Sequence, residues 1–371
     1  RLAGVNFQRG SGQEYLPAIR SPVFTGPGGC GGLLVKEDGI SLRAAGFCNL
    51  NELFEAHTEV ASQIEVLKGA GTSIHGSNAL HGVINVITPD RASMNTATLE
   101  RMKSGSNRLK FTVNSGGESP VVFAGTFAGY KGHRTDSGYD QQKVSVRHYY
   151  ERPKYSVETG TTLSNLNQET AGYITGLEVY KDESVALSNP NPEAFRDARA
   201  ARVWSRFTLG SNKSELSVKP YVRYTEMEFL QHFLPGKPLE ENGQKSFGLQ
   251  IYSSGNLSDI VDFSIGVDAE FTKAYLKQTQ FAETSGSTFL QATVPIGKHY
   301  DYTVDARQIA PFFQIRKDLT DTISVALGSR YEEMKYDYQN RMLSGRSRDD
   351  GTPCGFGGCR YSRPDSGINN Y

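Results

Sequence analysis

The sequence predicts a mainly β protein in two parts: a small mixed α/β unit over residues 1–90 and an antiparallel transmembrane β-barrel over residues 91–371. Three observations lead to this prediction. The first 90 residues combine short β-like runs with a glycine-rich segment. After about residue 95, apolar residues recur at every second position, which is typical of strands with one apolar and one polar face. Short and long connections then alternate along the chain, as in barrels of an outer membrane.

The composition excludes several classes of protein. Lysine plus arginine equals aspartate plus glutamate at 40 each, so the net charge is zero and no basic excess indicates a nucleic-acid partner. No uninterrupted apolar stretch approaches the ~18 residues of a membrane helix. This excludes a helical membrane protein, but barrel strands alternate and give only weak hydropathy signals.

A glycine-rich segment, IEVLKGAGTSIHGSNALHGVINVIT, runs from Ile64 to Thr88. A dinucleotide-binding fingerprint would have its third glycine where this sequence has Ile74. A phosphate loop would need Gly-Lys-Ser/Thr, whereas Gly76 is followed by Ser77. Each nucleotide-binding template therefore lacks a residue that it requires. We therefore interpret the glycines at 69, 71, 76 and 82 as places of positive φ and close backbone approach in a structural turn.

The rest of this unit supplies its helical and extended parts. Asn49 and Glu52 stand at capping-box spacing before an apolar pair, which predicts the start of a helix. Val83 to Thr88 is β-branched and apolar apart from Asn85, so it is expected to form a strand.

The alternating runs assign residues to two faces of the barrel. One set should face lipid, because bilayer lipid offers no partner for a charge: Val261, Phe263, Ile265 and Val267. The other set should face the lumen: Asp262, Asp268, Arg206, Arg223 and Arg330.

The runs between about residues 95 and 339 number roughly eleven, about half of the 22 strands that surround a plugged lumen. The last run, Thr322 to Tyr338, should end on the external side. Residues 340–371 are expected to form a long loop with no returning strand. The chain is therefore expected to be incomplete and to form a partial barrel wall.

Four cysteines form two local pairs in glycine-rich sequence. Zinc sites favour Cys-x-x-Cys spacing with neighbouring histidines, and neither pair has it, so we predict no metal site and no cofactor. An even count in exposed loops favours two disulfides, Cys30–Cys48 and Cys354–Cys359, over four free thiols.

The N-terminal unit resembles the plug of TonB-dependent outer-membrane receptors. The family pattern is close to IEVLRGPxSxLYGSxAxGGVINIIT, and this sequence has Lys68, Ala70 and His75 at the positions of the usual arginine, proline and tyrosine. The family's IRG element corresponds to Ile19-Arg20-Ser21, and LLVKEDG matches its element ending in Asp38-Gly39. The barrel segment PFFQ…LGSRYEEMKYDY is also family-like.

The resemblance implies active uptake across the bacterial outer membrane, with a plug that an energised, TonB-type inner-membrane complex pulls. The family's partner-binding box precedes the plug and is not within this sequence. A ferric siderophore is the commonest family cargo, with cobalamin, saccharides and peptides as alternatives. The implied plug and gating residues are Arg20, Asp38, Gly39, Glu65, Lys68, Gly69, Gly76, Gly82 and Asn85.

Two further expectations concern individual side chains. Arg20, Glu65 and Lys68 should be paired charges shielded from bulk water, because buried charges need partners. Phe229, His232 and Phe233 lie near the external end and could contact a ligand, with loop packing as the alternative role.

An outer-membrane barrel enzyme is one alternative function, but the seven histidines show no nucleophile signature, so we predict no enzyme. A passive porin or an adhesin is another, and neither needs a plug. The expected partners are thus the TonB-type complex, a small molecule or metal chelate, and membrane lipid, with no nucleic acid.

Overall fold

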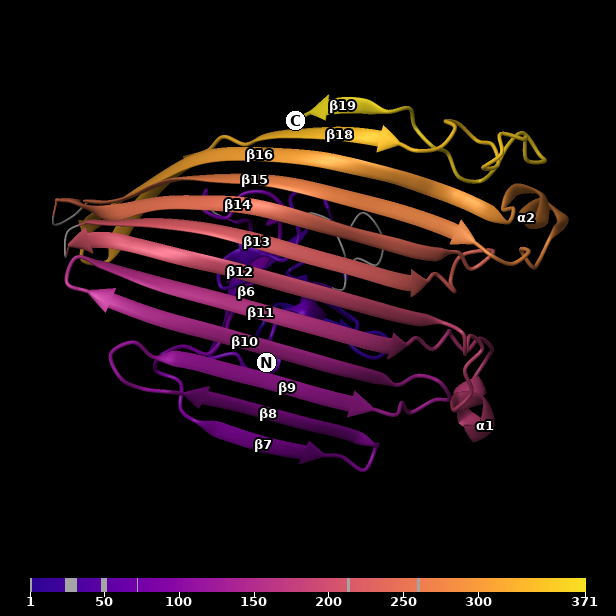
Figure 1. Cartoon of the computed structure of the whole chain (residues 1–371), viewed down its shortest axis with the longest axis horizontal. Coiled ribbons are helices and arrows are strands. Elements are labelled where there is room, and N and C mark those ends of the chain that lie inside the picture. The colour runs from indigo at the N-terminus through magenta and orange to yellow at the C-terminus, as the bar shows by residue number, and fades with distance from the viewer. Residues whose placement is uncertain (1, 24–31, 48–51, 72, 212–213, 259–260) are drawn as a thin grey trace.

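The computed structural model describes residues 2–371 except 24–31, 48–51, 72, 212–213 and 259–260. Most of the described chain forms one large antiparallel sheet, called the wall below. The described residues up to 90, called the N-terminal module, pack against one face of the wall (Figure 1). Among the described residues, no helix is both long enough and apolar enough to cross a membrane.

The N-terminal module contains two small sheets. A hairpin joins β1 (Val5–Arg9) to β2 (Tyr15–Ile19). The second sheet has the order β4-β3-β6-β5, in which β3 and β6 run parallel. Its strands are β3 (Leu33–Glu37), β4 (Ile40–Ser41), β5 (Gln63–Lys68) and β6 (Gly82–Ile87).

The helical part of the module is short. Two 3₁₀ turns, η2 (Glu52–Glu55) and η3 (Thr58–Val60), are its helices in the described residues. The proposed cap Asn49 lies outside the described residues. A small core of Val35, Leu42, Ala56 and Val86 joins η2 to the second sheet, so these turns are held by tertiary packing.

The wall has the order β19-β18-β16-β15-β14-β13-β12-β11-β10-β9-β8-β7, and β17 also pairs with β16 (Figure 1). Its shorter strands are β7 (Thr96–Arg101), β8 (Ser106–Asn114), β9 (Val121–Tyr130), β17 (Ile323–Arg330), β18 (Glu333–Asn340) and β19 (Gly367–Asn370). Its long strands are β10 (Tyr139–Arg152), β11 (Tyr155–Glu169), β12 (Phe195–Ser211), β13 (Ser214–Leu230), β14 (Leu239–Ser258), β15 (Val261–Gln280) and β16 (Gly297–Thr320).

The expected number of about eleven runs up to residue 339 is confirmed in the described wall. β17 and β18 both pair with β16 and form one run, interrupted at residues 331–332, which follows the ten strands β7 to β16. The expectation that no strand returns after residue 340 is wrong. β19 pairs antiparallel with β18, because a compact loop between them brings the chain back beside Tyr338. The described sheet stays open, with β7 and β19 at its edges.

The two ends of the wall differ as expected. Short turns, such as 153–154 and 321–322, lie at one end. The other end carries the longer connections 170–194, 281–296 and 341–366 (Figure 1). These connections hold η4 (Val179–Lys181), α1 (Glu183–Ala186) and α2 (Thr288–Thr293). The end with the long connections is called the loop end below.

The prediction of a disulfide between Cys354 and Cys359 is confirmed, with the two Cα atoms 5.0 Å apart in the 341–366 loop. The predicted pair Cys30 and Cys48 lies outside the described residues. Arg363 is buried in the same loop and donates hydrogen bonds to the backbone oxygens of Leu343 (2.6 Å) and Ser347 (2.7 Å). The disulfide and this guanidinium together close the loop that leads into β19.

The assignment of faces is confirmed where side chains make contacts. Ile265 is 54% exposed on the face away from the module. Arg223 donates to the backbone oxygen of Ser41 in the module (2.6 Å), and Arg330 pairs with Asp268 (2.8 Å). Arg206 pairs with Glu158 on the same face (3.2 Å). The polar face of the wall therefore faces the module, and the apolar face lies outside.

Candidate functional site

The contact between the module and the wall is rich in buried charge. The module contributes carboxylates from the end of β3 and from the two 3₁₀ turns: Glu37, Asp38, Glu55 and Glu59. The wall contributes cations from β10, β12 and β13: Lys143, Arg147, Arg202, Lys219 and Arg223. Each cation falls on the inward face because side chains alternate along a strand. This set is called the charged interface below.

Arg202 lies at the centre of the charged interface. Its Nε and Nη2 atoms donate to Glu37 Oε1 at 3.1 and 3.0 Å, and Nη2 also donates to the backbone oxygen of Glu55 at 2.8 Å. The Glu55 carboxylate in turn accepts two hydrogen bonds from Arg43 of the module. The Arg202 and Glu37 side chains are each 2% exposed, so both ions depend on each other for the interactions that water would provide.

The turn at Asp38 and Gly39 packs against side chains on the inward face of the wall. Asp38 has a φ of 51° and Gly39 a φ of 81°, which makes a tight left-handed turn between β3 and β4. The Asp38 carboxylate accepts hydrogen bonds from the Thr88 backbone N–H (3.0 Å), the Thr88 hydroxyl (2.8 Å) and Arg147. Its backbone oxygen accepts a hydrogen bond from Lys219. The Asp38-Gly39 element found in the sequence is thus a tight turn that hydrogen bonds from Thr88, Arg147 and Lys219 hold in place.

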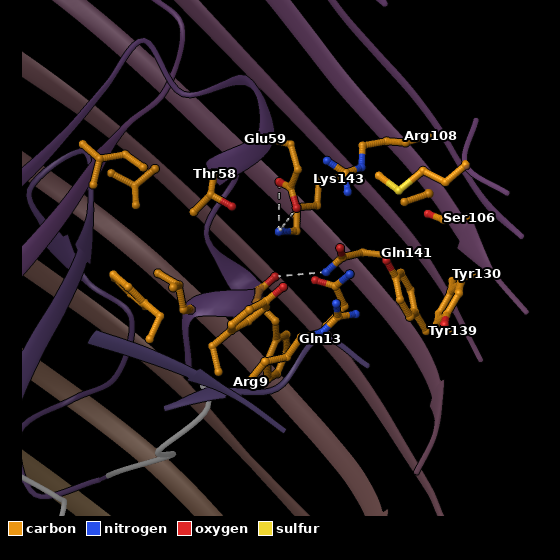
Figure 2. A pocket seen from close by; sticks show the side chains of 18 of the residues that line it. Arg9, Gln13, Thr58, Glu59, Ser106, Arg108, Tyr130, Tyr139, Gln141 and Lys143 are labelled. Atoms are coloured by element: carbon orange, nitrogen blue, oxygen red, sulfur yellow. Dashed lines mark hydrogen bonds and ion pairs between the residues drawn. The ribbon is translucent and has the colours of Figure 1, made fainter. Parts of the chain in front are cut away.

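Lys143 of β10 closes one side of the charged interface. Its ammonium donates to both oxygens of Glu59 at 3.0 and 3.1 Å (Figure 2). It also donates to the backbone oxygen of Ala56 at 2.7 Å. Burial by itself would raise the pKa of Glu59, but the charge and hydrogen bond of the Lys143 ammonium, together with a backbone hydrogen bond, outweigh it and hold this pKa below its usual value. Glu59 is therefore ionised at neutral pH.

His57 is fully buried where the module meets β9 and β10. Its Nδ1 contacts the Ser145 hydroxyl, and its Nε2 lies 2.9 Å from the Thr126 hydroxyl. Its backbone N–H donates to Glu37 (2.7 Å). Burial, and then the nearby Lys143 ammonium, lower the pKa of His57 to about 4. The imidazole is therefore neutral at pH 7, with two hydroxyl groups as its partners.

The only tryptophan of the chain, Trp204, lies inside this charged interface. The Lys219 ammonium is 4.3 Å from its ring, and the guanidinium groups of Arg147 and Arg206 are 5.4 and 5.6 Å away. Cations over an indole face are attracted to its π electrons. The indole therefore separates three like charges and attracts each of them.

The prediction that Arg20, Glu65 and Lys68 are shielded ion pairs is wrong. All three side chains are exposed, and none forms an ion pair with a described residue. Glu65 accepts a hydrogen bond from Asn85 (2.8 Å), and the Lys68 ammonium reaches only the backbone oxygen of Ala3 (3.5 Å). Glu65 and Lys68 are exposed because β5 is the edge strand remote from the β3–β4 turn that docks on the wall, and Arg20 lies just after β2 in the other small sheet.

The remaining predicted plug residues shape the backbone and the sheet of the module itself. Asn85 links Gly39, whose N–H donates to its side-chain oxygen (2.9 Å), to Glu65 across the sheet. Gly69 has a φ of 120° and Gly76 a φ of 71°, which L side chains rarely adopt. Gly82 lies at the start of β6, where β6 pairs with β3.

A cavity of about 610 Å³ lies between the β1–β2 hairpin, the 3₁₀ turns and strands β8 to β10 (Figure 2). Its walls carry the cationic side chains Arg9, Arg108 and Lys143, the Glu59 carboxylate that pairs with Lys143, and the aromatic side chains Tyr15, Tyr130 and Tyr139. Cationic and aromatic groups together suit an anionic or aromatic ligand.

The predicted ligand residues do not line this cavity. Phe229 is buried beneath the Arg196 guanidinium, 4.7 Å from its ring, and packs in a core with Phe54 of the module. His232 is half-buried in the turn after β13, where burial lowers its pKa, and Phe233 beside it is exposed. Within the described chain, no group of three or more His, Cys, Asp or Glu side chains is placed to hold a metal ion.

Sequence reasoning singled out Asp38 and Arg223 but missed the ion pairs of the charged interface and His57. The pairs join residues far apart in the chain, such as Glu37 and Arg202, so no local spacing shows them. The one available signal was the regular placement of cations on the inward positions of β10, β12 and β13, opposite an acidic N-terminal unit.

Comparisons with solved structures support the fold. No family model matches the sequence. The ferric citrate transporter FecA in its unliganded form matches with a TM-score of 0.72 at 12% identity, covering 91% of this chain and 53% of that chain. The ferric yersiniabactin uptake receptor FyuA from Yersinia pestis matches with a TM-score of 0.72 at 13% identity, covering 100% and 56%. The ferripyoverdine receptor of the outer membrane of Pseudomonas aeruginosa matches with a TM-score of 0.70 at 14% identity, covering 93% and 50%.

The chain spans about half the length of these solved structures. All three are transporters or receptors by name, and none is an enzyme. The resemblance to TonB-dependent outer-membrane receptors is therefore confirmed at the level of the fold.

Proposed function

We propose that this chain works in TonB-dependent active uptake across the bacterial outer membrane, with residues 1–90 as the plug and residues 91–371 as barrel wall. The observation that carries this proposal is the charged interface. The module is held on the wall by buried ion pairs, such as Arg202 with Glu37 and Lys143 with Glu59, beside apolar contacts made by Phe54 and Ile40. The plug sequence motif and the likeness to solved transporters support the same function.

The chemistry of the interface suits a plug that must move. In each buried ion pair, removing one of the two charged side chains leaves the other charge buried without a partner, which is strongly unfavourable. When a whole plug is pulled into a wet lumen, however, both ions of each pair regain water. An apolar contact of the same size would lose its full burial free energy on separation. A charged interface can therefore be firm at rest and still separable under force from a TonB-type complex.

The proposed cargo is a ferric siderophore or a similar anionic metal chelate. Solved structures with this fold include proteins named for ferric citrate, ferric yersiniabactin and ferripyoverdine. The cavity beside the module presents Arg9, Arg108 and three tyrosines, which offer charge and aromatic contact to such a chelate. Phe233 and His232 are proposed as additional contacts near the loop end.

The test is uptake of radioactive iron by a host strain that lacks its own ferric-chelate receptors and produces this receptor. Ferric citrate, a ferric catecholate and a ferric hydroxamate are supplied separately. We expect iron to accumulate from at least one chelate, and a protonophore that dissipates the inner-membrane potential to stop it. Accumulation that the protonophore leaves unchanged would contradict active transport, and no accumulation from any chelate would contradict the proposed cargo.

A passive porin is distinguished by conductance in a planar bilayer. A plugged receptor should remain nearly closed, because the module occupies the inner face of the wall. A large steady conductance of the purified receptor would favour the porin instead.

A further inference from the structure

Three cations of the charged interface take all their ion-pair and hydrogen-bond partners within the described chain from the module: Lys143, Arg202 and Lys219. These partners are carboxylates and backbone oxygens within residues 37–59. The two remaining wall cations also pair with carboxylates of the wall itself. Arg147 lies 3.1 Å from Glu158, and Arg223 lies 2.5 Å from Glu270. Removal of the module would therefore leave the first three cations without a carboxylate among the described residues.

These three cations, called the cation ladder below, follow one another along the inward face of the wall, which the module covers (Figure 1). The register with β11 places Arg202 one inward row further from the loop end than Lys143. Lys219 lies two inward rows further again, because Arg202 is directly opposite Arg223 on the strand that carries Lys219. Successive inward rows are roughly 7 Å apart, since side chains on one face of a strand recur at every second residue. The ladder therefore runs from the loop end towards the end with the short turns.

An aromatic row separates the second and third cations of the ladder. Trp204 of β12 lies directly opposite Tyr221 of β13, and both rings are buried and pack against Ile40 of the module. Gly160 of β11 lies opposite Trp204 on its other side, and a side chain there would collide with the indole. The small size of Gly160 therefore lets the ring lie against the wall. The inward surface under the module thus combines cations with aromatic rings.

We propose that the cation ladder binds an anionic metal chelate on its way through the wall, after the module has moved. The cations that hold the module at rest then exchange its carboxylates for the anionic oxygens of the chelate. The aromatic row offers ring faces on which a planar aromatic group of the same chelate can stack. The ligand class is therefore an anionic chelate with aromatic groups, such as a ferric catecholate, and an uncharged ferric hydroxamate fits less well.

The exchange of partners is favourable because the ladder places like charges along one wall. The carboxylates of the module offset their repulsion at rest. When the module leaves, water restores part of the lost solvation, but the row of cations still attracts anions and repels cations. Arg202 is ready for a further partner, because its buried Nη1 makes no hydrogen bond within the described chain and lies 3.8 Å from Glu55 Oε2. This inference rests on the proposed function in that the module leaves the wall during uptake.

The test measures the ion selectivity of the purified receptor in a planar bilayer while urea displaces the module. The strands of the wall are hydrogen-bonded to one another within the bilayer, whereas water can replace the ion pairs of the module, so urea should displace the module first. The reversal potential in a gradient of potassium chloride then gives the chloride-to-potassium permeability ratio. The variants are K143Q, R202Q and K219Q. The matched control is R199Q, since Arg199 lies on the same strand as Arg202 but is exposed on the outward face.

Each ladder variant should lower the permeability ratio of the open receptor by roughly twofold, because one cation fewer faces the passing ions. K219R keeps the charge and should keep the ratio of the unaltered receptor, as should R199Q. A ferric catecholate should block the chloride current, and R202Q/K219Q should require a roughly tenfold higher concentration for the same block. An uncharged ferric hydroxamate should block both receptors equally weakly.

An unchanged permeability ratio in all three ladder variants would overturn the proposal, as would a fall in R199Q as large as that in K219Q. Equal block by the ferric catecholate and the ferric hydroxamate would overturn the choice of ligand class. A receptor that stays closed in urea would show that the module does not uncover the ladder, which also contradicts the proposal. The measurement involves no uptake and no energised partner, so its failure and a failure of chelate uptake are separate results.

Discussion

The two faces of the wall hold opposite chemistry at similar depth. The inward face carries buried ions, such as Arg202 and Arg223, which pair with carboxylates and backbone oxygens. The outward face carries Phe247, Ile265 and Phe271, each about half exposed in the isolated chain. A water-soluble protein has the reverse arrangement, with apolar side chains inside. The difference teaches that the inward face has a charged protein module as its partner, whereas the apolar outward face has no protein partner among the described residues and, in the proposed function, meets lipid.

The largest expected effect comes from the inward face. Arg202→Met leaves Glu37 buried without its cation, which should lower the free energy of unfolding by about 3–5 kcal/mol. The double variant Glu37→Gln, Arg202→Met should recover most of this loss, because neither charge is then left alone. Denaturant titration of both variants measures the difference.

A matched control lies on the same strand. Arg199 is exposed on the outward face and pairs with the half-buried Glu226 at 3.5 Å, so Arg199→Met should change stability by less than about 1 kcal/mol. If Arg202→Met were as mild as Arg199→Met, the charged interface would not hold the module on the wall.

The second effect tests the outward face. Ile265→Arg places a cation on the apolar outward face of the wall and should destabilise the bilayer-inserted protein by about 2–4 kcal/mol. Ile265→Val keeps an apolar side chain and should cost about 0.5–1.5 kcal/mol or less. Unfolding from phospholipid vesicles measures both variants. An arginine tolerated as well as valine would mean that this face meets water instead of lipid.

The third effect is a pH dependence at the inward face. Because the pKa of His57 is about 4 in the folded protein and near 6.5 when unfolded, the unfolded chain binds the proton more tightly. The contribution of His57 to the free energy of unfolding is therefore complete above pH 6.5 and is lost as the pH falls towards about 4. The loss amounts to at most about 3 kcal/mol.

The variant His57→Gln should reduce the pH dependence between pH 6.5 and 5 by the share of His57, while His75, whose pKa burial also lowers to about 4, keeps its own share. The pKa of Glu59 is held below its usual value, so that carboxylate stays ionised in this window. His148→Gln is the control, since His148 is exposed and contacts only the Ser119 hydroxyl (3.0 Å). If His57→Gln kept the full pH dependence of the unaltered protein, protonation of His57 would not be its cause.

Local patterns in the sequence were enough to predict the wall. Strict alternation from Val261 to Phe271 fixes which side chains share a face, because successive residues of a strand point in opposite directions. The number of runs and the short Cys354–Cys359 bridge also follow from nearby residues. The return of the chain as β19 was not predictable in this way, because the four-residue strand is stabilised by its position beside β18.

The sequence by itself determined the strands of the wall, its two chemically different faces and the turn-rich character of the N-terminal module. Only the tertiary structure decided which charges meet. The plug motif drew attention to Arg20 and Lys68, which are exposed, while Glu37 and Arg202, 165 positions apart, form a buried pair. The physical reason is that periodicity arises from the geometry of one strand. An ion pair between distant segments depends on how the module docks against the wall, and that docking brings His57, Glu37 and Arg202 together.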